Sequence, residues 1–257
     1  MKGFCPLASG SKGNSIYIGT ETTKLLVDAG LSAKSIIARL NQIGVDIKDI
    51  DAILVTHEHI DHIRGLFVLC SKWNIPIFAN SDTAKAILSQ AQVPLKFKIF
   101  STGETFEYGD IEIHPFSVQH DAADPVAFTF SFNGIKIGVC ADLGFASTLV
   151  ENQLRNCDYL YIEANHQPEM VHASARPMVY KQRVLSRQGH LSNEACAKLV
   201  QSILHKNLKY IFLAHLSSEC NAPDLAISIL KKMLDTSGAS TDVSVAYQDQ
   251  VSHAVLF

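Results

Sequence analysis

Apolar residues occur in short runs separated by Gly, Asn and Asp turns, and this pattern predicts many short strands interspersed with helices. In the first third, residues 4–8, 14–19 and 23–29 read as strands, and Ser32 is placed to cap a helix. Further on, Asn133-Gly134 separates two apolar runs and is a two-residue hairpin signal. Strand-like runs at 159–163, 209–214 and 243–247 then alternate with helical spacing at 192–204 and 224–234.

This alternation of strands and helices predicts an α/β fold in which sheets pack together and helices cover them. The 257 residues contain 47% apolar side chains, enough for a sizeable core. No Pro-rich or Gly/Ser-rich linker, low-complexity tract or clear sequence repeat divides the chain. We therefore expect one domain spanning residues 1–257.

The net charge and the cysteines indicate which ligands and which cellular compartment suit the protein. The formal net charge is −3, so any site for a polyanion must be local. The six cysteines form no CxxC pair and have mostly apolar neighbours, which is typical of buried thiols in a reducing compartment. Residues 1–3 lead directly into a strand-like run without a signal-peptide core, and no apolar stretch is long enough to span a membrane. A bacterial-type cytoplasm fits these features best.

The densest chemical signal is Thr56-His57-Glu58-His59-Ile60-Asp61-His62, which follows a short apolar strand. Imidazole and carboxylate are ligands suited to Zn²⁺, Mn²⁺ or Fe, and side chains in a strand-to-loop connection can converge on one point. A solvated polar loop is the plain alternative. We favour a metal site because three histidines and an aspartate within six positions are hard to explain by packing or by solvation.

The segment from His57 to His62 resembles the HxHxDH signature of the metallo-β-lactamase superfamily, and the resemblance extends along nearly the whole chain. It implies the αβ/βα four-layer sandwich of that superfamily. It also implies an acid at the end of an early strand that supports the ligand loop, and Asp28 matches it. Without the histidine cluster, Asp28 would read as an ordinary strand-end acid.

The same resemblance implies two divalent metal ions, Zn²⁺ or Mn²⁺ with Fe as a further possibility. One ion would be held by His57, His59 and His120, and the other by Asp61, His62 and His215, with Asp142 bridging. His120, Asp142 and His215 each follow a strand-like run, although each alone would be read as a loop residue. Two such metals acidify a water and polarise the bond to be cleaved, so no Ser or Cys nucleophile is needed.

Three segments are similar to a bacterial branch of the superfamily, the YycJ/WalJ-like subgroup. Residues 8–15 resemble its SGSxGN opening, residues 163–166 resemble its ESNH segment with Ala164 in place of Ser, and residues 189–193 match its GHLSN segment. The last also resembles the His-Ser element of tRNA 3′-processing nucleases, in which a histidine pairs with an acid and assists proton transfer. Here the pair would be His190 and Glu163, which otherwise read as a loop histidine and a strand-end acid. With Asp61 they are the candidate catalytic residues.

The subgroup includes 5′-to-3′ DNA exonucleases, so phosphodiester hydrolysis is the leading hypothesis and nucleic acid, DNA above RNA, is the expected substrate. One basic segment favours it, since no acid lies between positions 171 and 191. Its cations are Arg176, Lys181, Arg183 and Arg187. Such a segment is commonly just solvated surface, but beside a metal site it can bind phosphates.

Three other functions are open on the sequence alone. A small-molecule hydrolase of the same fold, such as a thioesterase, lactonase or cyclic phosphodiesterase, is the main alternative. A non-catalytic regulator is disfavoured by the intact ligand set, and a redox di-iron protein by the lack of a flavodoxin-like extension. Fold resemblance by itself does not decide the substrate.

Overall fold

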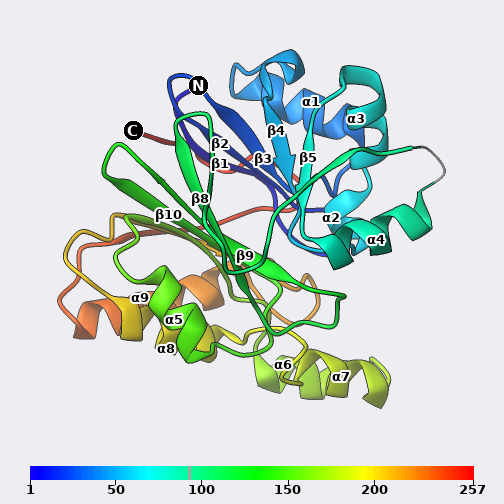
Figure 1. The fold of residues 1–257 in the computed structure, drawn as a ribbon. Helices are drawn as coiled ribbons and strands as arrows, with labels where there is room; N and C mark the ends of the chain where they lie inside the picture. The colour runs from blue at the N-terminus through cyan, green and yellow to red at the C-terminus, as the bar shows by residue number, and fades with distance from the viewer. Residues whose placement is uncertain (92–93) are drawn as a thin grey trace. The chain divides into compact units, whose positions relative to one another are not determined.

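The computed structural model describes residues 1–91 and 94–257, which form two compact units (Figure 1). The first unit comprises Met1–Ile113, Ala122–Val126 and Ala246–Phe257, and the second comprises His114–Asp121 and Ala127–Val245. Each unit has its own sheet and its own hydrophobic core. The expectation that the whole chain acts as one domain stays a prediction.

The first unit is built on a sheet with the strand order β14-β1-β2-β3-β4-β5-β6. Its strands are β1 (Gly3–Ala8), β2 (Ser15–Gly19), β3 (Lys24–Val27), β4 (Ala52–Leu54), β5 (Ile77–Ala79), β6 (Phe97–Ile99) and β14 (Val255–Leu256). Its helices are α1 (Ala33–Gln42), the 3₁₀ turn η1 (Ile47–Asp49), α2 (Ile60–Ile63), α3 (Leu66–Trp73) and α4 (Ser81–Gln90). β7 (Phe106–Tyr108) also belongs to this unit and pairs with the start of β8 (Ile111–Ser117).

The core of the first unit lies between this sheet and its longer helices. α1 starts where the sequence predicts, because the Ser32 side chain accepts a hydrogen bond from the Ser35 N–H. α1 contributes Ile36 and Leu40 to the core, and α3 contributes Leu66 and Leu69, all fully buried. Burying a side chain of this kind stabilises a fold by about 1.5–3 kcal/mol. The helical packing therefore holds the carboxyl ends of β3 and β4 in place.

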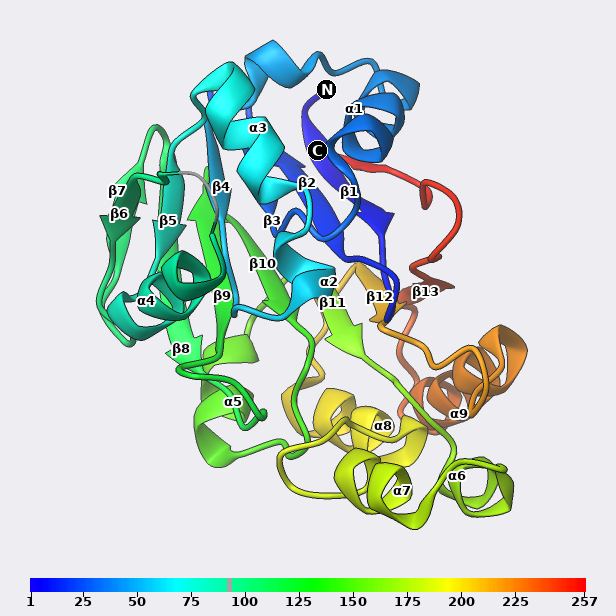
Figure 2. The ribbon, with the colours of Figure 1, turned by 90° about the vertical axis from the view of Figure 1, so that its right-hand side faces the viewer.

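The second unit is built on a sheet with the order β13-β12-β11-β10-β9-β8, to which β7 adds at the edge. Besides β8, its strands are β9 (Val126–Phe132), β10 (Ile135–Cys140), β11 (Tyr159–Glu163), β12 (Tyr210–Ala214) and β13 (Asp242–Val245). Its helices are α5 (Thr148–Leu154), α6 (Pro168–Ala173), α7 (Met178–Val184), α8 (Asn193–Ile203) and α9 (Pro223–Thr236). α6 and α7 lie side by side in both ribbon views (Figures 1 and 2).

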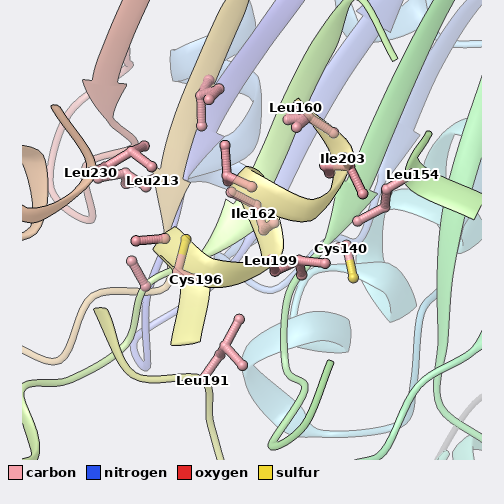
Figure 3. Packing of buried hydrophobic residues seen from close by; sticks show 14 of the residues in the cluster. Cys140, Leu154, Leu160, Ile162, Leu191, Cys196, Leu199, Ile203, Leu213 and Leu230 are labelled. Atoms are coloured by element: carbon pink, nitrogen blue, oxygen red, sulfur yellow. The ribbon is translucent and has the colours of Figure 1, made fainter. Parts of the chain in front are cut away.

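Helix α8 forms the centre of the second core (Figure 3). Its Ser192 side chain caps the helix by accepting from the Ala195 N–H, as the sequence predicts. Cys196, Leu199 and Ile203 share one face of this helix and are buried. They pack in one cluster with side chains of the central strands, among them Leu160, Ile162 and Leu213. This packing fixes the strands from whose ends the polar residues of the unit extend.

The two sheets share one topology. β2 and β3 are antiparallel, α1 follows, and β4, β5 and β6 then add in parallel. In the second unit β9 and β10 are antiparallel, α5 follows, and β11, β12 and β13 add in parallel. The residues Asp28 and Asp142, which follow β3 and β10, both have positive φ, at 62° and 57°. Non-glycine residues adopt this conformation rarely and often at functional sites.

The six cysteines are free thiols, and all except Cys70 are buried. Burial raises the pKa of Cys5 and of Cys157 to about 12, so these thiols stay protonated at neutral pH. The prediction that they serve as small packing residues agrees with this. In the parts of the chain that the structure describes, no helix combines the length and hydropathy needed to cross a membrane.

Candidate metal centre

In the first unit, the predicted ligand segment forms the connection between β4 and α2. His57 lies three residues after the end of β4, and His59 is the residue that precedes α2. The ring centroids of His57 and His59 are 4.6 Å apart, and those of His57 and His62 are 4.1 Å apart. Asp61 Oδ2 lies 3.7 Å from His62 Nε2. The strand-to-helix turn therefore brings the four predicted ligands of this segment together.

Asp28 anchors this turn from the neighbouring strand. The carboxylate is buried, and its Oδ1 accepts from the Thr56 N–H at 2.9 Å. Its Oδ2 accepts from Thr56 Oγ1 at 2.9 Å and from His62 Nδ1 at 2.7 Å. Because Thr56 Oγ1 gives its proton to Asp28, it accepts from His57 Nδ1 at 3.0 Å. One carboxylate thus fixes the orientation of two histidines, in the supporting position that the sequence predicts for it.

Asn14 and Gly30 hold the ligand segment on its other side. The Asn14 N–H donates to the Asp61 carbonyl at 2.8 Å, and the Asn14 amide donates to His62 Nε2 at 3.0 Å. A Cβ at Gly30 would lie 1.6 Å from the Asp61 carbonyl oxygen, so only glycine allows this close approach. This role of Asn14 was not predicted from the sequence. The one signal for it is the position of Asn14 at the end of a Gly/Ser turn.

In the second unit, the predicted residues collect at the carboxyl ends of adjacent parallel strands. Asp142 follows β10 by two residues, Glu163 is the last residue of β11, and His215 directly follows β12. These strands are parallel neighbours, so their ends meet at one edge of the sheet. With His190, which precedes α8, their ligand atoms all lie within 4.8 Å of one another. His120 lies three residues after β8, with its Nε2 3.9 Å from Asp142 Oδ1.

Glu163 is fully buried and accepts four hydrogen bonds. Its Oε2 accepts from the Leu143 and Leu191 N–H groups at 3.0 and 3.1 Å. Its Oε1 accepts from His190 Nδ1 at 2.8 Å and from His215 Nδ1 at 3.2 Å. Burial by itself raises the pKa of Glu163, but the adjacent His190 and these hydrogen bonds outweigh burial and lower the pKa below its ordinary value. The group is therefore a carboxylate at neutral pH.

His120 is oriented by a backbone carbonyl. Its Nδ1 donates to the Gly189 oxygen at 3.1 Å, and its ring centroid is 5.2 Å from that of His190. Burial lowers the pKa of His120, which favours the neutral ring. The loop that carries His190 thus also sets the orientation of His120.

The two motif segments of this unit lie next to each other. The Asn165 N–H donates to the Leu191 carbonyl at 2.8 Å, and the Asn193 N–H donates to the His166 carbonyl at 3.0 Å. The Asn165 amide donates to the His215 carbonyl at 2.7 Å, which holds a residue whose φ is 53°. Asn165 belongs to the segment 163–166 of the family resemblance, but no function was predicted for it. Nothing in the sequence indicated that its partner would be His215, 50 positions away.

The chemistry of both clusters fits metal ions. The Nδ1 atoms of these histidines donate to Asp28, Thr56, Glu163 or the Gly189 carbonyl, so the Nε2 atoms of their rings are unprotonated. In this structure the Nε2 lone pair of His62 accepts from the Asn14 amide. Fixing the tautomer by an outer hydrogen bond is the usual arrangement around metal-binding histidines. Neutral imidazoles with nearby carboxylates form a donor set suited to Zn²⁺ or Mn²⁺.

The basic segment of the second unit has partners from elsewhere in that unit. Arg176 forms an ion pair with Glu219, and Arg183 Nε lies 2.6 Å from Asp121 Oδ2. Lys181 Nζ donates to the His172 carbonyl at 2.6 Å. Two of the predicted phosphate-binding cations are therefore already neutralised by carboxylates. The segment offers less free positive charge than its sequence suggests.

These clusters, on this fold, define the class of the protein. A family model described as the metallo-β-lactamase superfamily matches residues 8–154, and the chain belongs to that superfamily. The predicted α/β class, metallo-β-lactamase fold and metal-dependent hydrolase chemistry are confirmed.

Individual relatives match the chain over more of its length than this family model does. The chain is 40% identical over 238 residues to the exodeoxyribonuclease YycJ of Bacillus anthracis, covering 91% of this chain and 90% of the relative. It is 42% identical over 225 residues to the exodeoxyribonuclease WalJ of Streptococcus pneumoniae, covering 86% and 83%. Among solved structures, the metallo-β-lactamase fold protein YhfI of Bacillus subtilis superposes with a TM-score of 0.74 at 16% identity, over 97% of this chain and 98% of that one. The resemblance to the YycJ/WalJ-like subgroup is thereby confirmed.

We predict that Glu163→Gln destabilises the fold by about 3–5 kcal/mol, because the amide NH₂ then faces two of the four groups that donate to this side chain and leaves a buried network broken. Loss of the histidine support should also lower metal affinity by roughly 10–100-fold. Urea unfolding and metal titration measure the two effects. Glu104→Gln, at an exposed position, is the matched control and should change neither. Wild-type stability in Glu163→Gln would show that this carboxylate is not a structural anchor.

Proposed function

We propose that this protein is a nuclease that hydrolyses phosphodiester bonds in DNA, removing nucleotides in the 5′-to-3′ direction. The observation that carries the proposal is the 40% identity to a protein named exodeoxyribonuclease over nine-tenths of both chains. A match of 238 residues must include most of both units, and hence both polar clusters. The free thiols also fit work in a reducing compartment such as a bacterial-type cytoplasm.

The proposed centre contains two divalent ions, and the family pattern assigns their ligands. His57, His59 and His120 would hold one ion, Asp61, His62 and His215 would hold the other, and Asp142 would bridge them. When bound, such ions lower the pKa of a water and stabilise the charge that develops on the phosphoryl group. The engaged Nδ1 atoms of His57, His120 and His215 support this assignment, because they leave Nε2 as the donor atom. At His62, whose Nδ1 is held by Asp28, a metal would replace the Asn14 amide as the partner of Nε2.

His190 is the proposed general acid. Its Nδ1 donates to Glu163 Oε1, so its Nε2 remains to give a proton to the sugar oxygen that leaves when the P–O bond breaks. The ring is about one-sixth exposed, at 16%, whereas Glu163 is inaccessible, so the histidine alone of the pair can reach a substrate. The ionised Glu163 stabilises the protonated ring before transfer and orients it afterwards. Asp61, the third candidate, lies beside His62 and is partly exposed, at 19% of its side chain.

We expect two metal ions per chain at saturation. His59→Ala should deplete one ion and abolish turnover, since a remaining pair of histidines holds the first ion weakly. Elemental analysis of the purified and reconstituted protein gives the stoichiometry, and His253→Ala, an exposed histidine, is the control. A single ion at saturation in the wild type would contradict the dinuclear proposal.

His190→Ala should lower kcat by roughly 10²–10⁴-fold, the range for loss of general acid–base assistance. It should keep both metals, because we assign its role to proton transfer. Steady-state kinetics together with metal analysis separate these effects, with His172→Ala on the exposed surface of α6 as control. Loss of metal would identify His190 as a ligand, and unchanged kcat would remove it from the mechanism.

End-labelled single- and double-stranded DNA and RNA, each with Mn²⁺, Mg²⁺ or Zn²⁺, test the proposed activity directly. We expect successive shortening of DNA from its 5′ end and weaker action on RNA. Bis-p-nitrophenyl phosphate reports on the metal centre independently of polymer binding. Hydrolysis of this ester without cleavage of any polynucleotide would favour a small-molecule hydrolase instead.

A further inference from the structure

An exposed aromatic–arginine stack lies between the loop after Asp142 and the loop before His190. The Arg187 Cζ is 4.0 Å from the centre of the Phe145 ring, so the guanidinium lies over the ring. Phe145 is 38% exposed, and Arg187 is also exposed. A large apolar ring kept at the surface and covered by a cation does not contribute to the buried core of this unit.

The backbone that carries the stack is anchored to the candidate catalytic residues. A Cβ on Gly144 would lie 2.6 Å from the Arg187 carbonyl carbon and 2.6 Å from the Gly189 nitrogen, so the two loop backbones touch there and require glycine. The Glu163 carboxylate accepts from the backbone of both loops, at Leu143 and at Leu191. The Gly144 N–H also donates to the Gln119 carbonyl at 2.9 Å. The anchor that positions His190 therefore positions the stack too.

Arg187 differs from the other arginines of the basic segment in its charge environment. Arg176 is paired with Glu219 and Arg183 with Asp121. Across residues 1–91 and 94–257, Arg187 forms no ion pair with a carboxylate, and its one described partner is the Phe145 ring. Its positive charge is therefore available to a phosphate, and its planar group together with the ring is available to a nucleobase.

We propose that Phe145 and Arg187 form a stacking platform for an unpaired base of a single-stranded polynucleotide, with the guanidinium edge contacting the adjacent phosphate. This extends the proposed nuclease function, on which it rests, by stating where the strand lies. Phe145 is three residues from Asp142 and Arg187 three residues from His190, so the Cα atoms of each pair are at most about 10–11 Å apart. The platform would therefore hold a base a few nucleotides from the scissile bond.

The chemistry matches this ligand better than the alternatives. Base–aromatic stacking tolerates any sequence because every base has a flat face, and an arginine adds cation–π and phosphate contacts. A base inside a duplex already stacks on both faces and cannot use the platform. The stack should therefore favour single strands or frayed ends over blunt duplex.

Binding of a single-stranded phosphorothioate DNA of about 12 nucleotides to the metal-loaded, full-length protein tests the platform, because this ligand resists hydrolysis. Phe145→Ala and Arg187→Ala should each weaken binding by about 5- to 150-fold, the loss expected for one stacked base. Phe145→Trp should bind at least as tightly as the wild type, and Arg187→Lys should recover only part of the loss, since it restores charge without the plane. Leu149→Ala, an exposed apolar position on α5, is the control and should bind normally.

A second readout places the base. With 2-aminopurine at successive positions from the 5′ end, quenching should peak within the first few nucleotides and disappear in Phe145→Ala. Unchanged affinity and unchanged quenching in both alanine variants would overturn the platform while leaving the nuclease proposal standing. Equal losses for single strand and blunt duplex would overturn stacking in favour of a phosphate contact alone. If the wild type neither binds nor cleaves any polynucleotide, the nuclease proposal fails first and the platform fails with it.

Discussion

The buried carboxylate of Glu163 is the interaction on which the second polar cluster depends. A single inaccessible anion at the end of β11 accepts from two backbone amides and two imidazoles, so it joins the loops after β10, before α8 and after β12. A buried charge without partners would cost several kcal/mol of stability, so the fold requires the four donors around Glu163. The same hydrogen bonds orient the rings of His190 and His215, which the proposed chemistry uses. Stability and function are therefore coupled through one side chain.

Asp28 performs the equivalent task in the first unit with a different set of partners. It accepts from the Thr56 backbone, the Thr56 hydroxyl and His62, and through the hydroxyl it also orients His57. In each unit a buried carboxylate thus orients two of the clustered histidines. Asp28 orients His62 and, through Thr56, His57, and Glu163 orients His190 and His215. The metal affinity of a site of this kind depends on the residues that hydrogen-bond to its ligands. A substitution there can change the affinity although every metal-binding atom is kept.

Much of the architecture could be predicted from local signals in the sequence. Asn133-Gly134 marks its hairpin, Ser32 and Ser192 cap their helices, and the spacing from His57 to His62 predicts the turn where these histidines gather. What escaped prediction depends on residues that are distant in the chain. The segment around Arg183 contains no acid, yet Asp121 approaches it across 62 positions, and Glu219 reaches Arg176 across 43. A count of charges along the sequence cannot include such partners, because chain folding decides them.

The repeated topology has a consequence for how the chain divides its chemistry. Asp28 and Asp142 occupy the same place in two copies of one backbone plan, both in the left-handed region and both at the end of the second strand of an antiparallel pair. The neighbouring parallel strand then differs: β4 leads into a run of histidines, whereas β11 ends in an acid. Asp28 consequently has an imidazole to orient, whereas Asp142 lies beside Glu163, which already accepts hydrogen bonds from His190 and His215. The same backbone plan thus gives the two aspartates different surroundings, and the residues that end the adjoining strand decide the difference.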